Sequence, residues 1–381
     1  TGSAYGLMIP IGTEMTQMEH RFVPTRFKDG YGPVGMWFQY FGAKITNSKG
    51  EDYTVTREAE LHKYKPYGLV VPTPTPLRNH QMFLDIKDGL GPMYMGTDKA
   101  MQKIAGDDPE KMRKVKEEAW GDFLDMTISQ ALTWASQDIR PEVTPSEVVL
   151  AEPYIMGSHS GESGAWVSGP EDLAPSDYFW GYNKMTTIKG LFAAGDGVGA
   201  APHKFSSGSF TEGRLAAKAA VNFLNDNPED STLNDGQVIS LRDKIWAPLE
   251  RFEKYKGAST AEEVNPHYLT PYQALVRLQK IMDEYAGGIS AWYTTNKPTL
   301  ERGIQLIGLL REDLNKLAAR DRHELMRCWE VIHRTWVGES HMRHLLYREE
   351  TRWPGYYYRS DFPDLDDSKW RVFVNSRFDS E

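Results

Sequence analysis

The stretch Gly190-Leu-Phe-Ala-Ala-Gly195-Asp196-Gly197 decides the fold, together with the glycine-rich residues that follow it. A short apolar run that ends in Gly-Asp-Gly predicts a strand over 190–196. The loop from 197 to 209 then leads into an Ala- and Leu-rich helix over about 210–224. A strand, a glycine-rich loop and a helix present backbone N–H groups and a positive helix end to an anion. The acidic residue can accept hydrogen bonds from sugar or ribityl hydroxyls, although a lone Gly-Asp turn is usually an ordinary strand–turn–helix.

Outward from this stretch, the sequence predicts a mixture of helices and strands. A helix is expected from Lys111 through Trp134, after the typical helix start Asp107-Asp108-Pro109-Glu110. A second strand is predicted over 146–155, before the loop Gly157-Ser-His159-Ser-Gly161. From about Leu233 the chain is mostly helical. Apolar residues at helical spacing mark two amphipathic helices there, around 275–282 and 300–317.

The composition excludes several classes of protein. The 381 residues carry a formal net charge of -9, and no Lys- and Arg-rich run alternates with aromatics, which argues against nucleic-acid binding. No stretch approaches the roughly 18 apolar residues that a membrane span needs. A single cysteine, Cys328, cannot form an intrachain disulfide or hold an iron–sulfur cluster alone. A lone thiol is typical of a reducing compartment, so we expect a cytoplasmic protein.

The beginning of the chain suggests a longer polypeptide. Thr1 is followed by Gly-Ser-Ala, with no initiator Met and no basic or apolar leader. We therefore expect Thr1 to be an interior point, with a further N-terminal part of the same subunit before it.

The pattern from Gly190 to Gly199, continued by Gly208 and Thr211-Glu-Gly-Arg214, resembles the second flavin-binding signature of the fumarate reductase/succinate dehydrogenase flavoprotein superfamily. In that superfamily the strand contacts FAD, and the Ser/Gly loop lies near the isoalloxazine ring. The first signature, a GxGxxG turn near the N-terminus, is absent from these 381 residues, as expected of a fragment. The resemblance implies FAD as the cofactor and FAD contacts at Gly195, Asp196, His203, Lys204, Ser207, Gly208 and Ser209.

Three segments narrow the resemblance to the family of dissimilatory adenylylsulfate (APS) reductase alpha subunits. They are Phe22-Val-Pro-Thr-Arg26-Phe-Lys-Asp-Gly-Tyr-Gly-Pro-Val-Gly35, Gly157-Ser-His159-Ser-Gly-Glu-Ser-Gly-Ala-Trp166-Val and Pro202-His-Lys-Phe-Ser-Ser-Gly-Ser209. The resemblance covers essentially the whole chain, as the C-terminal part of that subunit. It implies a mixed α+β and α/β flavoprotein of fumarate reductase type. The expected parts are a capping or substrate domain (1–145), the returning part of the Rossmann-like FAD-binding domain (146–230) and a helical C-terminal domain (231–381).

The family's chemistry is the reversible reduction of adenylylsulfate to sulfite and AMP through a flavin N5–sulfite adduct. Electrons come from an iron–sulfur beta subunit, because this chain cannot bind a cluster. By resemblance, Arg26 and His159 are the catalytic residues. A guanidinium can donate to two sulfonate oxygens at once, and an imidazole adds a donor or a cation. Phe22 and Phe38 match family positions near the substrate.

Each of these assignments has a structural alternative. Arg26 could be a surface salt-bridge residue, with Arg21 as a nearby competitor. His159 could be a hydrogen-bonded turn histidine, and His203-Lys204 could be solvated loop charges. Aromatic residues such as Phe22 are more often part of a core than of a cofactor wall.

His341 and His344 are three residues apart on a predicted helix, a spacing that two metal-ligating histidines could have. We interpret them as structural because no third ligand has a suitable spacing. Arg352 and Arg359 resemble the superfamily's C-terminal arginine-rich turn, and their role stays open.

Two other functions remain. A fumarate- or succinate-type dicarboxylate oxidoreductase would share the fold. However, its His-Pro-Thr element has Val23 at the His position, and Gly-Pro-Val-Gly replaces its arginine stretch. A non-catalytic scaffold that has kept the fold would be compatible with the same motifs.

Overall fold

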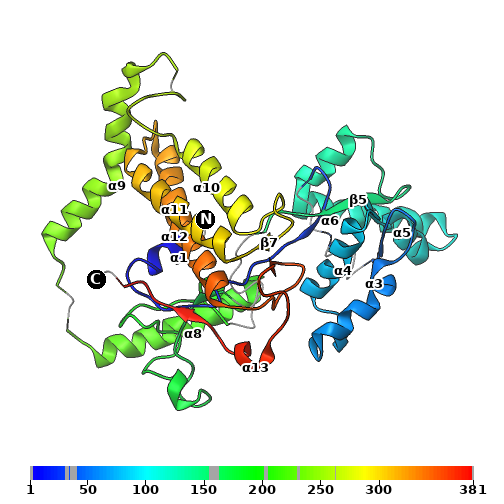
Figure 1. The fold of residues 1–381 in the computed structure, drawn as a ribbon, viewed down its shortest axis with the longest axis horizontal. Helices are drawn as coiled ribbons and strands as arrows, with labels where there is room; N and C mark the ends of the chain where they lie inside the picture. Colours follow the sequence, from blue (N-terminus) through cyan, green and yellow to red (C-terminus); the bar gives the residue numbers. More distant parts are fainter. Residues whose placement is uncertain are drawn as a thin grey trace. The chain divides into compact units, whose positions relative to one another are not determined.

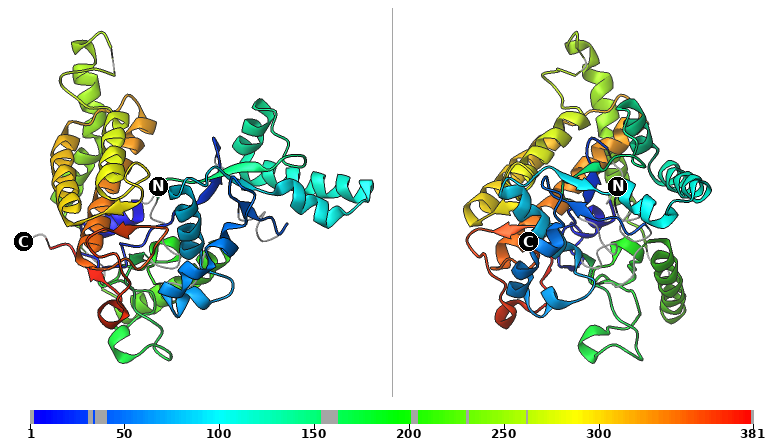
Figure 2. Two further views of the ribbon diagram at one scale, coloured as in Figure 1. Left: turned by 45° about the vertical axis from the view of Figure 1, so that its right-hand side comes forward. Right: turned by 90° about the vertical axis from the view of Figure 1, so that its right-hand side faces the viewer.

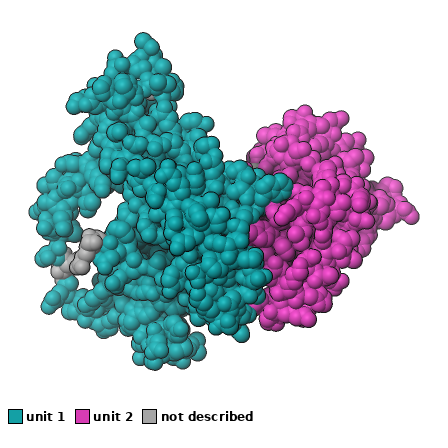
Figure 3. All heavy atoms as spheres, in the orientation of Figure 1, with its two compact units in different colours: residues 1–21, 155–351, 359–381 teal, residues 22–154, 352–358 magenta. Residues whose placement is uncertain are grey.

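The computed structural model describes residues 3–30, 34, 41–153, 163–200, 205–229, 232–261 and 263–379. Contacts group the chain into two compact units, coloured separately in Figure 3. Unit 1 comprises residues 1–21, 155–351 and 359–381, and unit 2 comprises residues 22–154 and 352–358. Each unit therefore contains segments that are far apart in the sequence, and each is described separately.

Unit 2 is built on a four-stranded antiparallel sheet with the order β2-β5-β4-β3. Buried and half-buried residues alternate along β5, as expected of a strand with one face against a core. The strands are β2 (Thr25–Phe27), β3 (Ile45–Thr46), β4 (Met93–Met95) and β5 (Ser146–Leu150). The helices are α3 (Tyr53–Thr56), η1 (Glu58–Tyr64), η2 (Tyr67–Leu69), α4 (Thr75–Lys87), α5 (Thr97–Ala105) and α6 (Pro109–Ser136).

The helix predicted over 111–134 is confirmed as α6. Asp108 caps it, because its carboxylate accepts hydrogen bonds from the N–H groups of Glu110 and Lys111. The buried Trp134 ring packs edge-on against Phe27 of β2, with ring centroids 4.9 Å apart. This contact anchors the end of α6 on the sheet.

Unit 1 is mainly helical, as predicted from about residue 233 onward. Its helices are α1 (Ser3–Met8), η3 (Ser176–Tyr178), η4 (Gly195–Gly197), α8 (Phe205–Asp226), α9 (Asp235–Tyr255), η5 (Lys256–Ala258), α10 (Pro271–Tyr285), α11 (Lys297–Asp313), η6 (Leu314–Lys316), α12 (Arg322–Tyr347) and α13 (Asp367–Trp370). Its strands are β1 (Met15–Thr16), β6 (Gly164–Ala165), β7 (Thr294–Thr295) and β9 (Asn375–Ser376). Of strand β8 (Tyr358–Arg359), Tyr358 is assigned to unit 2 and Arg359 to unit 1.

Helices α10, α11 and α12 pack side by side, as Figures 1 and 2 both show. The two amphipathic helices predicted around 275–282 and 300–317 are confirmed as α10 and α11. Each begins with a capping box, formed by Thr270 with Gln273 and by Asn296 with Thr299. Residues on the buried side of α11 recur at helical spacing, which fixes the face that the helix turns to its neighbours: Leu300, Gly303, Ile307 and Leu310.

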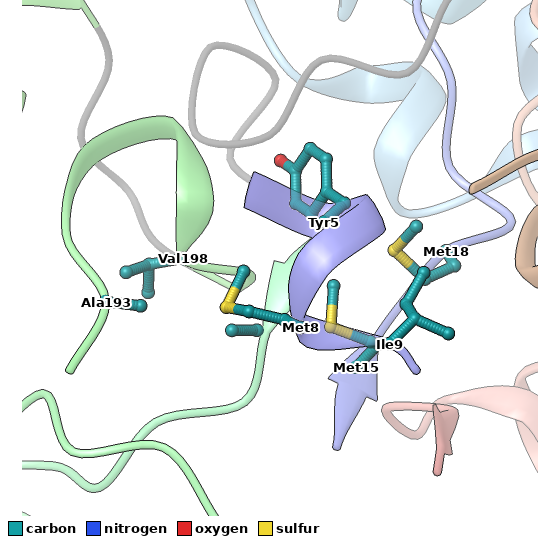
Figure 4. Packing of buried hydrophobic residues seen from close by; sticks show 8 residues of the cluster. Tyr5, Met8, Ile9, Met15, Met18, Ala193 and Val198 are labelled. Carbon is teal, nitrogen blue, oxygen red and sulfur yellow. The ribbon is translucent and has the colours of Figure 1, made fainter. Parts of the chain in front are cut away.

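A short three-stranded sheet, with the order β6-β1-β9, joins the two ends of the chain in unit 1. Its core packs against α1 and is closed by Ala193 and Val198 from the glycine-rich stretch (Figure 4). The other buried members of this core are Tyr5, Met8, Ile9, Met15, Met18 and Ala165. The glycine-rich stretch is therefore anchored on both sides of its turn.

The compact units do not follow the three domains predicted from the sequence. Residues 3–21 pack with unit 1, whereas the predicted capping domain began at residue 1. The residues of 146–153 pack with unit 2, because β5 pairs with β2 and β4. The predicted division describes roles toward a cofactor, and it stays a prediction.

A buried charged network ties the N-terminal segment to α12. The Arg348 Nε donates to Glu19 at 2.6 Å, and the His344 Nδ1 lies 3.1 Å from the other Glu19 oxygen. Burial alone would raise the pKa of Glu19, but the hydrogen bond with His344 and the positive charge of Arg348 lower it to about 2. His341 lies beside this network, with Nδ1 2.7 Å from the Met18 carbonyl oxygen. Both histidines thus have structural contacts, as interpreted from the sequence.

Two other arginines considered from the sequence also have structural partners. The buried Arg21 donates to the carbonyl oxygens of Ala286 and Gly287, at 2.7 and 2.6 Å, beyond the C-terminal end of α10. The buried Arg359 donates to Asp361 and to the Arg348 carbonyl oxygen. Arg21 therefore acts as a backbone clamp, which removes it as a competitor of Arg26.

Candidate functional site

The glycine-rich stretch forms a tight turn in which Gly195 is required by the backbone. Its φ is +63°, a conformation that side chains rarely adopt. A Cβ at Gly195 would also lie 2.9 Å from the Ser209 Oγ. The turn and the first residues of α8 are therefore in direct contact, which brings together the predicted cofactor residues Gly195 and Ser209.

A buried carboxylate on α8 holds this turn in place. Glu212 accepts a hydrogen bond from the Gly195 N–H at 2.9 Å and one from the Lys184 Nζ at 3.0 Å. The Glu212 side chain is 1% exposed and that of Lys184 is 16% exposed, so the pair is shielded from water. Glu212 lies within the quoted motif Thr211-Glu-Gly-Arg214, but no role was predicted for it. The available signal is its spacing, because Glu212, Ala216 and Ala219 follow one another on the buried side of the helix.

Two further glycines near the turn are required by close packing, whereas Gly197 is not. A Cβ at Gly199 would lie 2.3 Å from the Thr16 Cγ2, and one at Gly164 would lie 2.4 Å from the Gly199 nitrogen. Both glycines are thus needed for close packing of the strands. At Gly197 a Cβ would meet nothing within 4 Å, and φ is not positive there. The fold itself does not require Gly197, which leaves an open backbone position beside Asp196.

Polar groups around the turn suit a cofactor that carries hydroxyl and phosphate groups. Asp196 is exposed, and its backbone carbonyl accepts a hydrogen bond from the Tyr5 hydroxyl. The hydroxyls of Thr16 and Ser163 are buried and have no hydrogen-bond partner within the part of the chain that the structure describes. The accessible backbone at Gly197 suits the diphosphate of a dinucleotide cofactor. The exposed Asp196 carboxylate and the two unpartnered hydroxyls suit its polyol part.

The strand predicted over 190–196 is wrong in its extent. Only Phe192 forms a bridge, to Met185, and a 3-10 turn follows at once as η4. The segment is extended, but its backbone bonds reach residues 184–186 over too short a stretch to make a ladder.

The start of the following helix also differs from the prediction. Helix α8 begins at Phe205, so Ser207, Gly208 and Ser209 lie in its first turns and not in a loop. Small hydroxyl residues are favoured near the N-terminal end of a helix, where free N–H groups need partners. Ser207 is exposed, Gly208 is buried and Ser209 is half-buried. The predicted site residues Phe38, His159, His203 and Lys204 lie outside the described residues.

Arg26 lies in β2 of unit 2, where it pairs in register with Val149 of β5. Its side chain is 15% exposed, and its Nη1 lies 3.6 Å from a carboxylate oxygen of Glu152, which is itself 77% exposed. An ion pair of this length at an exposed carboxylate is weak. The guanidinium is thus largely buried, on the middle residue of a paired strand, and its ion pair with Glu152 is long.

Phe22 precedes this strand in the same unit and is half-buried. Its ring packs edge-on against the Tyr356 ring, with centroids 5.6 Å apart. The described part of the predicted substrate site therefore consists of Arg26 and Phe22. The predicted cofactor residues belong to the other unit.

Neither a metal site nor a membrane span is found among the described residues. They contain no group of three or more His, Cys, Asp or Glu side chains that could hold a metal ion. None of their helices is both long enough and apolar enough to cross a bilayer.

Comparison with known proteins gives consistent matches. A family model described as the fumarate reductase flavoprotein C-terminal region matches residues 276–380. The chain is 48% identical to the adenylylsulfate reductase subunit alpha of Megalodesulfovibrio gigas, over 99% of its own length and 58% of the relative. The solved adenylylsulfate reductase of Archaeoglobus fulgidus is 59% identical to this chain, with a TM-score of 0.97. The match covers 100% of this chain and 60% of the reductase chain.

The chain has a fumarate-reductase-type flavoprotein fold. Its predicted resemblance to adenylylsulfate reductase alpha subunits is confirmed along its whole length. A further solved structure, with the same identity, TM-score and coverage, is titled as adenosine-5-phosphosulfate reductase in complex with sulfite as a covalent adduct. The chain spans about three fifths of the length of these relatives.

Proposed function

We propose that this chain is part of the catalytic alpha subunit of an adenylylsulfate reductase, which reduces adenylylsulfate to sulfite and AMP. The observation that carries the proposal is the 59% identity, over the entire chain, to a reductase structure that holds sulfite as a covalent adduct. The Arg26 segment is compatible with it, because a guanidinium fixed on a paired strand can donate to two oxygens of a substrate anion.

The proposed reaction breaks the S–O bond between the sulfuryl group and AMP. The bridging oxygen leaves with AMP, and sulfur gains two electrons as it becomes sulfite. When bound, FAD supplies this electron pair. Arg26 binds two sulfonate oxygens and stabilises negative charge as it develops, and His159 adds a hydrogen-bond donor or a cation.

We assign FAD binding to the turn at Gly195–Gly197 and to the start of α8. Asp196 accepts hydrogen bonds from cofactor hydroxyls, and the open backbone at Gly197 lets the cofactor approach closely. The remaining contacts come from Ser207, Gly208 and Ser209 and, by the match of motifs, from His203 and Lys204.

Electrons are proposed to arrive from a partner subunit that carries iron–sulfur clusters. Such clusters are commonly held by four cysteines, and this chain has only Cys328. The remaining two fifths of the subunit, which the relatives possess, would complete the FAD-binding domain. A cytoplasmic location agrees with the single cysteine of the chain.

Sulfite tests this proposal against its rivals. The complete subunit is loaded with FAD, and the absorbance of the oxidised flavin is followed after sulfite is added. We expect rapid bleaching, and recovery when AMP and an electron acceptor are supplied. A flavin absorbance that is unchanged by sulfite but is bleached by succinate would favour the dicarboxylate oxidoreductase. A spectrum that responds to neither would favour a non-catalytic scaffold.

Replacing the buried carboxylate behind the turn should weaken FAD retention. In Glu212→Ala the Gly195 N–H and the Lys184 ammonium lose their shared partner, so the turn is no longer fixed. We expect the fraction of subunit purified with FAD to fall at least about threefold, since one lost buried charged hydrogen bond costs about 1.5–3 kcal/mol. Asp226→Ala is the control, because Asp226 lies on the same helix and its carboxylate accepts a bond from Tyr182 at an exposed position. Equal FAD content in both variants would refute the role of Glu212.

A further inference from the structure

The backbone that leads to Arg26 is held by one side chain of α4. Asn79 is buried, its Nδ2 donates to the Val23 carbonyl oxygen at 2.7 Å, and its Oδ1 accepts from the Thr25 hydroxyl at 3.4 Å. Asn79 thus bonds to the residues on both sides of Pro24. Pro24 has no N–H group and cannot contribute a backbone donor itself.

The opposite side of the same segment is held by β5. The Ala151 N–H donates to the Pro24 carbonyl oxygen at 2.9 Å, and Arg26 is in register with Val149. The segment 23–26 is therefore fixed between a strand and an asparagine. The strand sets the register of Arg26, and the asparagine sets the course of the chain that enters the strand.

A turn from the distant C-terminal region packs against α4 at the position of Asn79. Gly355 has a φ of +86°, and a Cβ there would lie 2.1 Å from the Pro76 carbonyl oxygen and 2.9 Å from the Asn79 Cβ. The backbone of this turn thus touches the backbone of the helix directly, and only glycine permits such an approach.

Aromatic contacts fix the same turn within unit 2. The Tyr358 hydroxyl accepts from the Gly355 N–H at 3.0 Å and lies 2.8 Å from the His80 Nδ1. The Tyr358 ring also stacks on Phe83 of α4, with centroids 5.0 Å apart. The turn therefore holds α4 through Gly355 and Tyr358, while its Tyr356 supports the Phe22 ring.

We propose that Asn79 is a positioning residue for Arg26, and that the turn of residues 353–358 keeps α4, and with it Asn79, in place. The inference rests on the proposed function, in which Arg26 binds the sulfonate oxygens. A guanidinium that donates to two oxygens at once tolerates little error in its placement, and a shift of about 1 Å can cost about 100-fold in rate. Asparagine suits this task because its amide offers a donor and an acceptor together.

The test is a double-mutant cycle in the complete holoenzyme, with kcat and the sulfite concentration that half-bleaches the flavin as its two readouts. Asn79→Leu keeps the approximate shape and removes both hydrogen bonds. We expect it to lower kcat about 10- to 100-fold when Arg26 is present. In an Arg26→Ala background the same change should cost less than about threefold, because the residue that Asn79 positions is gone.

Gly355→Ala tests the role of the turn independently, because it displaces α4 without removing a polar side chain. We expect the same dependence on Arg26, with a smaller decrease in kcat. Gly68→Ala is the matched control in the same unit. Its Cβ would lie 2.0 Å from the Leu61 carbonyl oxygen, yet Gly68 touches neither Asn79 nor the Arg26 segment in the contacts described. It should lower the melting temperature and leave kcat unchanged.

Equal losses from Asn79→Leu in both backgrounds would overturn the positioning role and indicate a general structural one. Unchanged kcat and unchanged sulfite bleaching in Asn79→Leu would overturn it as well. If Arg26→Ala alone leaves both readouts intact, the proposed role of Arg26 fails, and the failure is visible before the cycle is completed. The bleaching titration needs no turnover. The double-mutant cycle can therefore be completed with it even where Arg26→Ala abolishes measurable activity.

Discussion

Replacing Arg26 by alanine is expected to lower the turnover of adenylylsulfate by about 100- to 1,000-fold while the FAD content stays near that of the parent enzyme. Loss of one preorganised donor to a developing charge typically has an effect of this size. FAD content should persist, because the turn that we assign to FAD is anchored by Glu212 and by the core around α1. Arg26→Lys should restore only part of the rate, since an ammonium cannot donate to two oxygens in a fixed plane.

The control for Arg26 lies two residues further along the chain. Lys28 follows β2 and forms an exposed ion pair with Glu147, with 2.9 Å between Nζ and the carboxylate oxygen. Lys28→Ala should leave turnover within about twofold, since exposed pairs contribute little. Turnover is measured as AMP release, and FAD content from the absorbance of the denatured protein. If Arg26→Ala loses FAD and activity in the same proportion, the residue is structural and its catalytic assignment is wrong.

Replacing Arg348 by methionine is expected to destabilise the protein by about 3–5 kcal/mol at pH 7. The substitution leaves Glu19 and Glu350 as buried carboxylates without their shared cation. It also removes hydrogen bonds to the carbonyl oxygens of Trp370 and Val372, which hold the C-terminal tail. Lys369→Met serves as the control, because Lys369 pairs with Glu349 on the surface and should change stability by less than about 1 kcal/mol.

The pH dependence gives this prediction a direction. In the parent protein the pKa of Glu19 is about 2, below its usual 4.5, so its stabilising contribution is complete above pH 4.5 and is lost as the pH falls toward 2. Without Arg348 the buried Glu19 carboxyl favours its protonated form. The difference in melting temperature between the parent and Arg348→Met should therefore be largest near pH 7 and shrink toward pH 4. A difference that is constant or grows on acidification would contradict the charged network.

Local sequence patterns predicted the helices well. Helices α6, α10 and α11 were predicted because their apolar residues recur at helical spacing, and α6 also because a recognisable helix start precedes it. The strand over 190–196 could not be judged from its apolar run, since a strand also needs a partner of matching length. Its neighbour at residues 184–186 provides a single bridge.

Residues that act at a distance were beyond the reach of a single sequence. Glu19 and Arg348 are 329 positions apart, and neither carries a local pattern that indicates the other. Gly355 packs against α4, but nothing in the sequence near Gly355 points to that helix. Glu212 could have been found, because an acidic residue in line with Ala216 and Ala219 on a helix must be buried with a partner. Arg26 was predicted through a motif, and its site role stays a prediction; the structure shows that it is paired with Val149 of β5.

The most direct test of the central claim is product formation by the complete subunit with FAD, its iron–sulfur partner and a reduced electron donor. We expect AMP and sulfite to appear in equal amounts from adenylylsulfate, and fumarate to be left unreduced. Failure to release AMP, together with reduction of fumarate to succinate by the same preparation, would contradict the assignment of this chain to adenylylsulfate reduction.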